Sequence, residues 1–572
     1  MAEVLLSPGV LANENDSSFL QAQPVQAGAA ILGPTVKGPV GIPTVVTTYS
    51  EYQNKFGAVV ESGSAQYTYF TSIAAYNYFQ QGGDSLLVTR IVSGSYTPAT
   101  SSRVANNDAS ILSSFVLETL SEGTDQNSTS TLGSAGQLPS GSSENIRWEI
   151  VSPNTSSGTF SLLIRRGDDI TTSKTILETW ANLSLDPNAS NYIEKVIGNS
   201  TQTVTEDSGT GEYYVANAGT YNTISNFVRV KSVAAKTLNY FDNAGNAKSE
   251  FTASIPTAQS GTFGDADGTA FETISGDFYE NIGTNTQGLV AGNYTISLNL
   301  LANQDDYKYN LIVAPGLTKQ SHSAPLTTMV DTSQQRGDNL SVIDLRNYGS
   351  EINSVVNDAS SVDSSYAATY WPWVQTIDPD LGSQVWVPAS TMMPGVFAFN
   401  DTAGEAWFAP AGLSRGSMNT VLRAERKLTN GNRDTLYQAN VNPIATFPNA
   451  GVVVFGQKTL QTAASALDRV NVRRLLIALK NYISQIADNL VFEQNTIATR
   501  NNFLTQVNPY LASVQQRQGL YAFKVVMDDS NNTPDVIDRN QLIGQIYIQP
   551  TKTAEFIYLD FNILPTGATF PA

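Results

Sequence analysis

The sequence predicts a multidomain α+β protein, in which an αβ core is split along the chain by β-rich inserted domains. Three observations lead to this prediction. The chain has 572 residues, which predicts about three to five domains. Helical and strand-like periodicities alternate over residues 28–95 and return from residue 309. Between them, residues 98–300 are rich in Ser, Thr, Asn and Gly and contain short alternating segments typical of β-strands.

The N-terminal region is expected to hold a linking arm over residues 1–20 and the first part of the core over 21–97. The arm is too short and polar to fold alone, yet its apolar run at 4–6 could add to another sheet. In the core part, residues 29–33 and 86–92 have the composition of buried strands. Aromatic residues at helical spacing predict a helix over 65–80 that ends at Gly82 and Gly83.

Residues 98–300 are expected to form the inserted, β-rich outer domain or domains. Their alternating segments predict strands near 148–151, 160–164 and 294–298. Residues 301–460 are expected to form the second αβ part of the core, because the sequence again has apolar strand-like runs followed by loops. These predicted strands cover residues 309–316, 340–345, 366–374 and 385–388.

Residues 461–572 are expected to form a C-terminal domain with a helix and a β-hairpin. The helix, over 470–490, has an apolar stripe at i, i+3, i+4, i+7 spacing, made by Val472, Leu475, Leu476, Leu479, Tyr482, Ile483, Ile486 and Leu490. A second helix is predicted near 495–514. The alternating segments 541–548 and 555–563 are spaced for a hairpin. Because two strands alone are marginally stable in water, this hairpin is expected to pair with further strands.

Composition and charge exclude several classes of function. The net charge of −18 argues against a protein whose whole surface binds nucleic acid. The charge is uneven: residues 101–300 carry 21 Asp/Glu and 10 Lys/Arg, whereas residues 411–480 carry 3 and 10. This asymmetry suggests that one surface meets an acidic partner. The chain has no apolar run of the ~18 residues typical of a membrane span and no signal-peptide pattern, so a soluble protein of a reducing cytoplasm is expected.

Three motifs resemble catalytic or ligand-binding sequences, and each lacks an essential part. There is no Cys, and His322 is the only His. Residues 412–416 match the G-x-S-x-G hydrolase motif, but in that class the His follows the Ser in the chain. Residues 33–39 lack the Gly-Lys-Ser/Thr order of a phosphate-binding loop, and 265–268 lack most ligands of a calcium loop. We therefore expect no enzyme, with no catalytic residues, cofactor or metal.

One basic cluster has helical spacing, and it consists of Arg469, Arg473, Arg474 and Lys480. Three of these positions could form a ridge beside the apolar stripe of the predicted helix. This ridge could be a solvated face, could form ion pairs within the chain, or could dock on an acidic neighbouring protein. Nucleic acid is the least favoured ligand, since the cluster is small and no aromatic residues are interleaved with it.

The sequence resembles the tail sheath proteins of contractile-tailed bacteriophages of the myovirus type, which are related to the sheaths of type VI secretion machines and R-type pyocins. The resemblance covers about half of the chain and is strongest toward the C-terminal end. The segments that carry it are 5–10, 30–57, 81–90, 410–416, 436–438, 442–444, 469–475, 531–540 and 548–550.

The resemblance implies a structural subunit that polymerises as stacked hexameric rings around a tail tube. Contraction of the sheath would drive the tube through the host envelope for genome ejection. The implied partners are further copies of the chain, the tube protein, and baseplate and tail terminator proteins, with no direct nucleic acid and no membrane. The implied location is the virion, and the host cytoplasm during assembly.

The resemblance also implies that terminal segments of neighbouring subunits complete one sheet. The residues expected to take part are Val4, Leu5, Leu6, Val10, Ile546, Ile548, Ile557, Leu559, Phe561 and Ile563. The basic ridge would face the tube, and flexible links near 10–25 and 490–520 would absorb the movement on contraction.

Two other kinds of protein remain as alternatives to a tail sheath protein. One is a different β-rich virion protein, such as a capsid or tail-spike-like protein. The other is a carbohydrate-active enzyme, which would use Trp371, Trp373 and Trp386 and would need a pair of carboxylates in a cleft.

Overall fold

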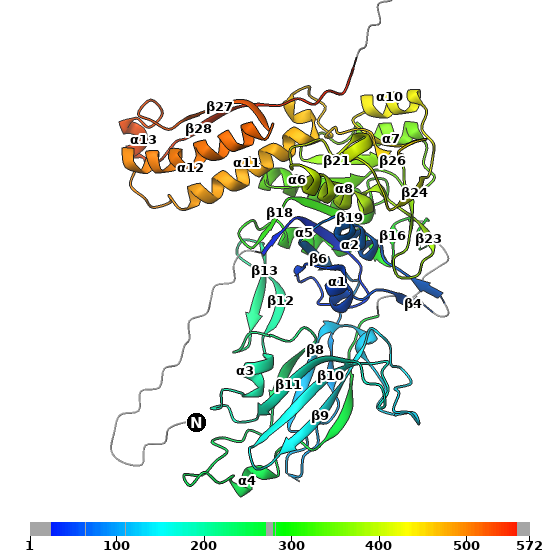
Figure 1. Cartoon of the computed structure of the whole chain (residues 1–572), viewed down its shortest axis with the longest axis vertical. Helices are drawn as coiled ribbons and strands as arrows, with labels where there is room; N and C mark the ends of the chain where they lie inside the picture. The colour runs from blue at the N-terminus through cyan, green and yellow to red at the C-terminus, as the bar shows by residue number, and fades with distance from the viewer. Residues whose placement is uncertain (1–24, 63–64, 109, 270–277, 281, 558–572) are drawn as a thin grey trace, which may run out of the picture.

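The computed structural model describes residues 25–557, except 63–64, 109, 270–277 and 281. Figure 1 shows a β-rich part at the bottom, an αβ part above it and a C-terminal unit of helices and strands at the upper left. The αβ part is formed by two stretches of the chain, because the β-rich part is inserted between them. The predicted strands that extend to residue 563 and the predicted arm at 1–20 fall wholly or partly outside the described residues.

The αβ part is built on an eight-stranded sheet, most of whose neighbouring strands are parallel. Only the strands at its two edges pair antiparallel. The central strands are buried along their length, as expected where helices cover both faces of a parallel sheet. In spatial order the strands are β26 (Gly451–Val454), β25 (Asn442–Phe447), β21 (Ala367–Trp371), β20 (Leu340–Asp344), β19 (Leu311–Thr318), β2 (Ala29–Gly33), β6 (Leu86–Arg90) and β3 (Thr44–Val46).

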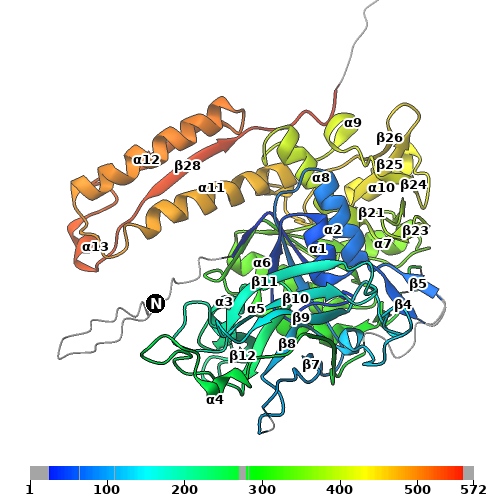
Figure 2. The ribbon, with the colours of Figure 1, turned by 60° about the horizontal axis from the view of Figure 1, so that its bottom comes forward.

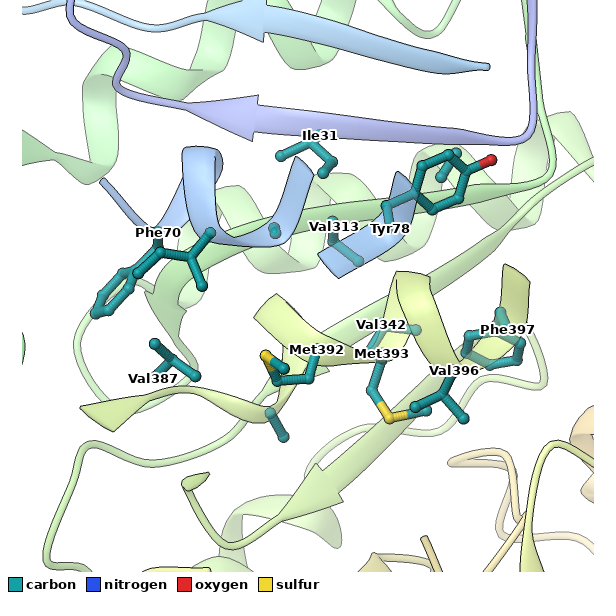
Figure 3. Packing of buried hydrophobic residues seen from close by; sticks show 14 of the residues in the cluster. Ile31, Phe70, Tyr78, Val313, Val342, Val387, Met392, Met393, Val396 and Phe397 are labelled. Carbon is teal, nitrogen blue, oxygen red and sulfur yellow. The ribbon is translucent and has the colours of Figure 1, made fainter. Parts of the chain in front are cut away.

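Helices cover the two faces of this sheet. On one face, α2 (Phe70–Gln80) packs against α8 (Ala389–Ala403), and Figure 3 shows Met392, Met393 and Val396 of α8 lying near Val342 of the sheet. The other face is covered by α5 (Thr295–Leu300), α6 (Ser323–Arg336) and α7 (Ile352–Ala359). Further helices are α1 (Tyr49–Phe56), α9 (Gly412–Arg415) and α10 (Asn430–Gln438).

Smaller sheets complete the αβ part. A three-stranded sheet has the order β23 (Gln384–Val387), β22 (Val374–Ile377) and β24 (Val421–Ala424). Three two-stranded sheets pair β1 (Val25–Ala27) with β18 (Tyr307–Tyr309), β4 (Val60–Ser62) with β5 (Ala65–Tyr67), and β16 (Asn285–Thr286) with β17 (Leu289–Val290). The helix predicted over 65–80 therefore begins later, at Phe70, because residues 65–67 pair as a strand.

The inserted part has its own seven-stranded sheet and its own apolar core, which contains the buried residues Trp148 and Phe115. Its strands, in spatial order, are β11 (Ile176–Ser184), β10 (Thr159–Arg166), β9 (Ile146–Asn154), β15 (Gln259–Gly264), β7 (Pro98–Ser101), β8 (Phe115–Glu122) and β14 (Val228–Val233). It also contains the hairpin of β12 (Thr201–Glu206) and β13 (Tyr213–Ala218), and the helices α3 (Ile193–Ile197) and α4 (Ser249–Thr252).

The sheet of the insertion ends at residue 264, well before the predicted domain boundary at 300. Residues 294–298, predicted as a strand, instead begin helix α5 and pack into the αβ core. The prediction was wrong because Tyr294, Ser297, Leu298 and Leu301 also have i, i+3, i+4, i+7 spacing, and all four are buried. A five-residue alternation cannot distinguish the two periods.

Candidate assembly interface

The C-terminal unit consists of two long helices that lie side by side and a two-stranded sheet (Figures 1 and 2). Its elements are α11 (Val470–Asp488), α12 (Ile497–Gln516), β27 (Leu520–Val526), α13 (Pro534–Asp538) and β28 (Gln545–Pro550). The apolar stripe predicted for the first helix supplies much of the unit's core, which also contains Phe503, Val507, Leu511 and Val514 of α12. Residues 490–520, predicted to be a flexible link, are therefore mostly a packed helix.

Trp407 joins this unit to the αβ part. Its ring is buried in the core of the C-terminal unit, although its segment follows helix α8 of the αβ part. The indole Nε1–H donates to the Arg517 carbonyl at 3.1 Å, and the Arg517 guanidinium lies 5.0 Å from the ring centroid. Such a buried aromatic side chain contributes a large apolar contact at the junction.

The two-stranded sheet has no third strand on either outer edge in the part of the chain that the structure describes. Strands β27 and β28 pair antiparallel, with Phe523 opposite Ile548 and Val525 opposite Ile546, and neither has another strand neighbour among the described residues. One face packs on α12, and the other exposes Tyr521 and Tyr547. A strand edge with free N–H and C=O groups is a site where a further chain can pair.

The predicted hairpin between 541–548 and 555–563 is corrected by this pairing. Its first strand exists, but it pairs with 520–526, the segment that follows α12, because that segment runs back along the same helix. Ile546 and Ile548 are half-buried against the unit's own core, and Ile557 is exposed and outside any strand. Leu559, Phe561 and Ile563, like Val4, Leu5, Leu6 and Val10, lie outside the described residues.

The predicted basic ridge is not an exposed surface. Arg473 is 4% exposed and Arg474 is 8% exposed. The Arg473 guanidinium lies 3.9 Å from the centroid of the Tyr366 ring, and its burial lowers the pKa of Arg473. Arg474 donates to both carboxylate oxygens of Asp401, at 2.8 and 2.5 Å. These two cations therefore fix α11 on the αβ part. The predicted alternative of an ion pair within the chain holds for Arg474, whereas Arg473 lies over the Tyr366 ring.

The other two cations also have partners within the chain. Lys480 is exposed and donates to the Tyr366 hydroxyl at 3.1 Å. Arg469 pairs with Asp468 at 2.9 Å and with Glu555 at 2.8 Å. Thus only Lys480 among the four predicted residues presents its charge at the surface.

Glu555 holds the segment after β28 on the αβ part. Its carboxylate accepts hydrogen bonds from the Tyr437 hydroxyl at 2.7 Å, Gln457 Nε2 at 3.0 Å and Arg469 Nε at 2.8 Å. Burial raises the pKa of Glu555, but these hydrogen bonds outweigh burial and hold its pKa below the usual value. We call Glu555 with these three donors the Glu555 latch. Sequence reasoning missed it, although Tyr437 lies in one of the segments that carry the resemblance.

The residues considered for catalysis are buried in the core or lie in a short helical turn. His322 is buried, its Nδ1 accepts from the Thr318 N–H, and its Nε2 lies 3.3 Å from the Thr284 carbonyl oxygen. Residues 412–415 form the single turn α9. Trp371, Trp373 and Trp386 are buried, so they offer no platform for a sugar. Within the described ranges there is no group of three or more acidic or His side chains that could hold a metal.

None of the described helices has both the length and the apolarity needed to cross a membrane.

Two domains of known proteins match the part of the chain that contains this candidate interface. Residues 290–460 match the phage tail sheath protein central domain, and residues 462–564 match the phage tail sheath C-terminal domain. The chain is 38% identical over 215 residues to the tail sheath protein of Vibrio phage KVP40, covering 38% of this chain and 32% of that protein. It is 34% identical over 248 residues to the tail sheath protein of Enterobacteria phage T4, covering 43% of this chain and 37% of that protein.

The matched segments thus span about a third of the length of these relatives. Among solved structures, the anti-feeding prophage helical sheath in its contracted state is 15% identical, with a TM-score of 0.48, over 98% of this chain and 99% of that chain. The resemblance found in the sequence is confirmed by the two domain matches and by the tail sheath relatives.

Proposed function

We propose that this chain, which carries the central and C-terminal domains of phage tail sheath proteins, is the structural subunit of a contractile tail sheath. Copies would polymerise as stacked hexameric rings around a tail tube, and contraction of the polymer would drive the tube through a host envelope. The observation that supports this most strongly is the pair of adjoining domain matches, which together run from residue 290 to 564. Baseplate, terminator and tube proteins would be its partners in the virion.

The joint between copies is proposed to be strand addition at the β27–β28 sheet. Both of its outer edges lack a strand neighbour in the described part of the chain. The apolar N-terminal residues Val4, Leu5, Leu6 and Val10 of one copy, and the C-terminal residues Leu559, Phe561 and Ile563 of another, have the composition to pair there. Backbone ladders formed in this way would keep copies linked while they move.

The subunit itself is proposed to move largely as one body, since its parts are firmly connected. Arg474 and Asp401 form a bidentate pair, and Trp407 is buried, both between the C-terminal unit and the αβ part. At the other junction, buried Arg90 donates to the carbonyl oxygens of Gly38 and Glu122 at 2.7 and 2.8 Å. Free energy for contraction would then come from contacts between copies, with the extended sheath as a kinetically trapped state.

Deletion of residues 1–18 tests this proposal. The full-length chain should form hollow tubes with a cogwheel-like cross-section in negative-stain electron microscopy. The deletion variant should keep the circular dichroism spectrum and Tm of the full-length monomer but form no long tubes. Tubes of normal length from the deletion variant would contradict strand addition by the arm, and failure of the full-length chain to form tubes would contradict the sheath function.

A further inference from the structure

We propose that the turn between α11 and α12 of one copy docks on a basic, partly apolar surface around β26 of the next copy. The acidic tip is the name we give to Asp488, Val491, Phe492, Glu493 and Ile497. The basic patch consists of Leu413, Arg415, Leu422, Arg423, Lys427, Arg433 and Phe455. This inference rests on the proposed function and adds a second contact between copies, which involves side chains and is separate from strand addition.

The acidic tip exposes a group of apolar side chains to solvent. Phe492 is fully exposed, and Val491 and Ile497 are more than half exposed. Phe492 also has a φ of 70°, a left-handed conformation that is uncommon for a large side chain. Aromatic side chains, Phe among them, are enriched at protein interfaces.

Two carboxylates flank this apolar group. Asp488 and Glu493 are exposed, and neither forms an ion pair with any residue that the structure describes. Two other acidic residues of the C-terminal unit, by contrast, have a cation close by: Asp529 pairs with Arg500 at 2.6 Å and Asp535 with Arg539 at 2.9 Å. The tip therefore combines an apolar centre with unneutralised negative charge.

The basic patch has the complementary composition. Its apolar side chains Leu413, Leu422 and Phe455 are each between 43% and 58% exposed. The elements that carry them adjoin one another: the Val454 N–H donates to the Gly416 carbonyl at 2.8 Å, and both α9 and β24 contact β26. Such an apolar group can receive the side chains of the tip.

The segments that carry this apolar group, or adjoin it in the chain, also hold four cations without a carboxylate partner in the described ranges: Arg415, Arg423, Lys427 and Arg433. Their neighbour Arg426, by contrast, is paired with Glu351 at 2.8 Å. Arg433 lies over the rings of Phe447 and Phe455, at 5.3 and 5.7 Å from their centroids. These cations account for much of the positive balance of residues 411–480 in a chain whose net charge is −18. Their positive charge would attract an acidic partner and fix the orientation in which it docks.

The positions of the two surfaces favour a second copy of this chain as that partner. In Figures 1 and 2 the turn between α11 and α12 lies on the left, beside α13, and β24 and β26 lie on the right, so the two surfaces occupy opposite sides of the upper part. Two unlike surfaces on opposite sides cannot close into an isologous dimer. They link each copy head to tail with the next, which produces rings or helical polymers.

Cysteine crosslinking tests the contact directly, because the chain has no Cys. Tubes assembled from the Phe492→Cys, Leu422→Cys double variant are treated with a short bismaleimide and separated on a denaturing gel. A ladder of covalent multimers extending beyond dimers is expected, since each copy contributes one tip and one patch. The matched control, Phe492→Cys with Leu112→Cys, places the second thiol at an exposed Leu of the insertion and should give no ladder.

Charge-reversal variants and a glycine variant distinguish an effect on docking between copies from an effect on folding of the subunit. Glu493→Lys and Lys427→Glu should each raise the protein concentration needed for assembly by about fivefold, and their combination should restore most of the loss. Phe492→Gly should weaken assembly while the Tm of the monomer is kept or raised, because Gly adopts a positive φ without strain.

Tubes that form normally but give no ladder would overturn this inference and leave the proposed sheath function intact. The same holds if the double charge variant assembles no better than the weaker of the two single variants. Absence of tubes from the unmodified chain would instead count against the proposed function itself.

Discussion

Replacing Glu555 by Gln should release residues 551–557 from the αβ part without unfolding the subunit. The carboxylate of the Glu555 latch accepts three hydrogen bonds at 2.7–3.0 Å from Tyr437, Gln457 and Arg469. Hydrogen bonds to charged groups contribute about 1.5–3 kcal/mol each when buried, and partial exposure reduces this. Gln keeps the shape and one acceptor but loses the charge. We therefore expect a loss of about 1–2 kcal/mol, which is roughly five- to thirtyfold in the equilibrium constant for local opening.

Hydrogen exchange measured by mass spectrometry is the assay for this loss. The amide of Thr551 donates to the Gly519 carbonyl at 3.1 Å, so exchange of a peptide that begins a few residues before Thr551 and ends at 557 reports on opening of the segment. The peptide should exchange about five- to thirtyfold faster in Glu555→Gln, while peptides of α11 are unchanged. Glu351→Gln is the matched control, because it breaks a surface pair with Arg426 in the αβ part and should leave 551–557 unaffected.

The pH dependence gives the same experiment a second readout. Because the pKa of Glu555 is lowered in the folded state from its usual value of 4.5, the latch should be at full strength above about pH 4.5. It should be lost as the pH falls through the lowered pKa. Exchange at 551–557 that is equally fast in the variant and in the unmodified chain, or protection that disappears near neutral pH, would refute the role given to this carboxylate.

Two further substitutions test the packing of the subunit. Trp407→Ala should destabilise the junction of the C-terminal unit by about 3–5 kcal/mol, because it leaves a cavity in a buried core. Calorimetry should then show a separate unfolding transition for this unit at a lower temperature. A single unchanged transition would contradict the role of Trp407. Burial raises the pKa of Asp344 to about 7, against the opposing hydrogen bonds from Ser390. The folded state therefore holds a proton that the unfolded state releases, and stability should fall as the pH rises from about 4 to 7. Asp344→Asn should remove this slope from the Tm, and a slope that persists in the variant would refute the assignment.

The sequence predicted best those elements whose evidence is local. The apolar stripe of α11 predicted a helix that runs from Val470 to Asp488, and Val472, Leu475 and Leu479 are buried as the spacing requires. The buried strands β2 and β6 were predicted from short apolar runs bounded by Gly. In both cases the pattern depends on neighbours within one element, which periodicity can detect.

The predictions that failed depended on partners far along the chain. Arg473 and Arg474 have the spacing of an exposed ridge, but they are buried because Tyr366 and Asp401 lie against α11. Strand β28 was expected to pair with the segment that follows it, yet it pairs with β27 across α13. No local pattern gives the position of these partners, so composition alone could not show that the basic cluster is part of the subunit's own packing.

A cryo-EM reconstruction of polymers assembled from the purified full-length chain tests strand addition between copies most directly. The expected map shows a hollow helical tube in which backbone from a neighbouring copy forms a hydrogen-bonded ladder with the outer edge of β27 or β28. A tube in which those edges carry no strand from another copy, or in which each copy's own terminal segments fill them, would contradict the proposed joint.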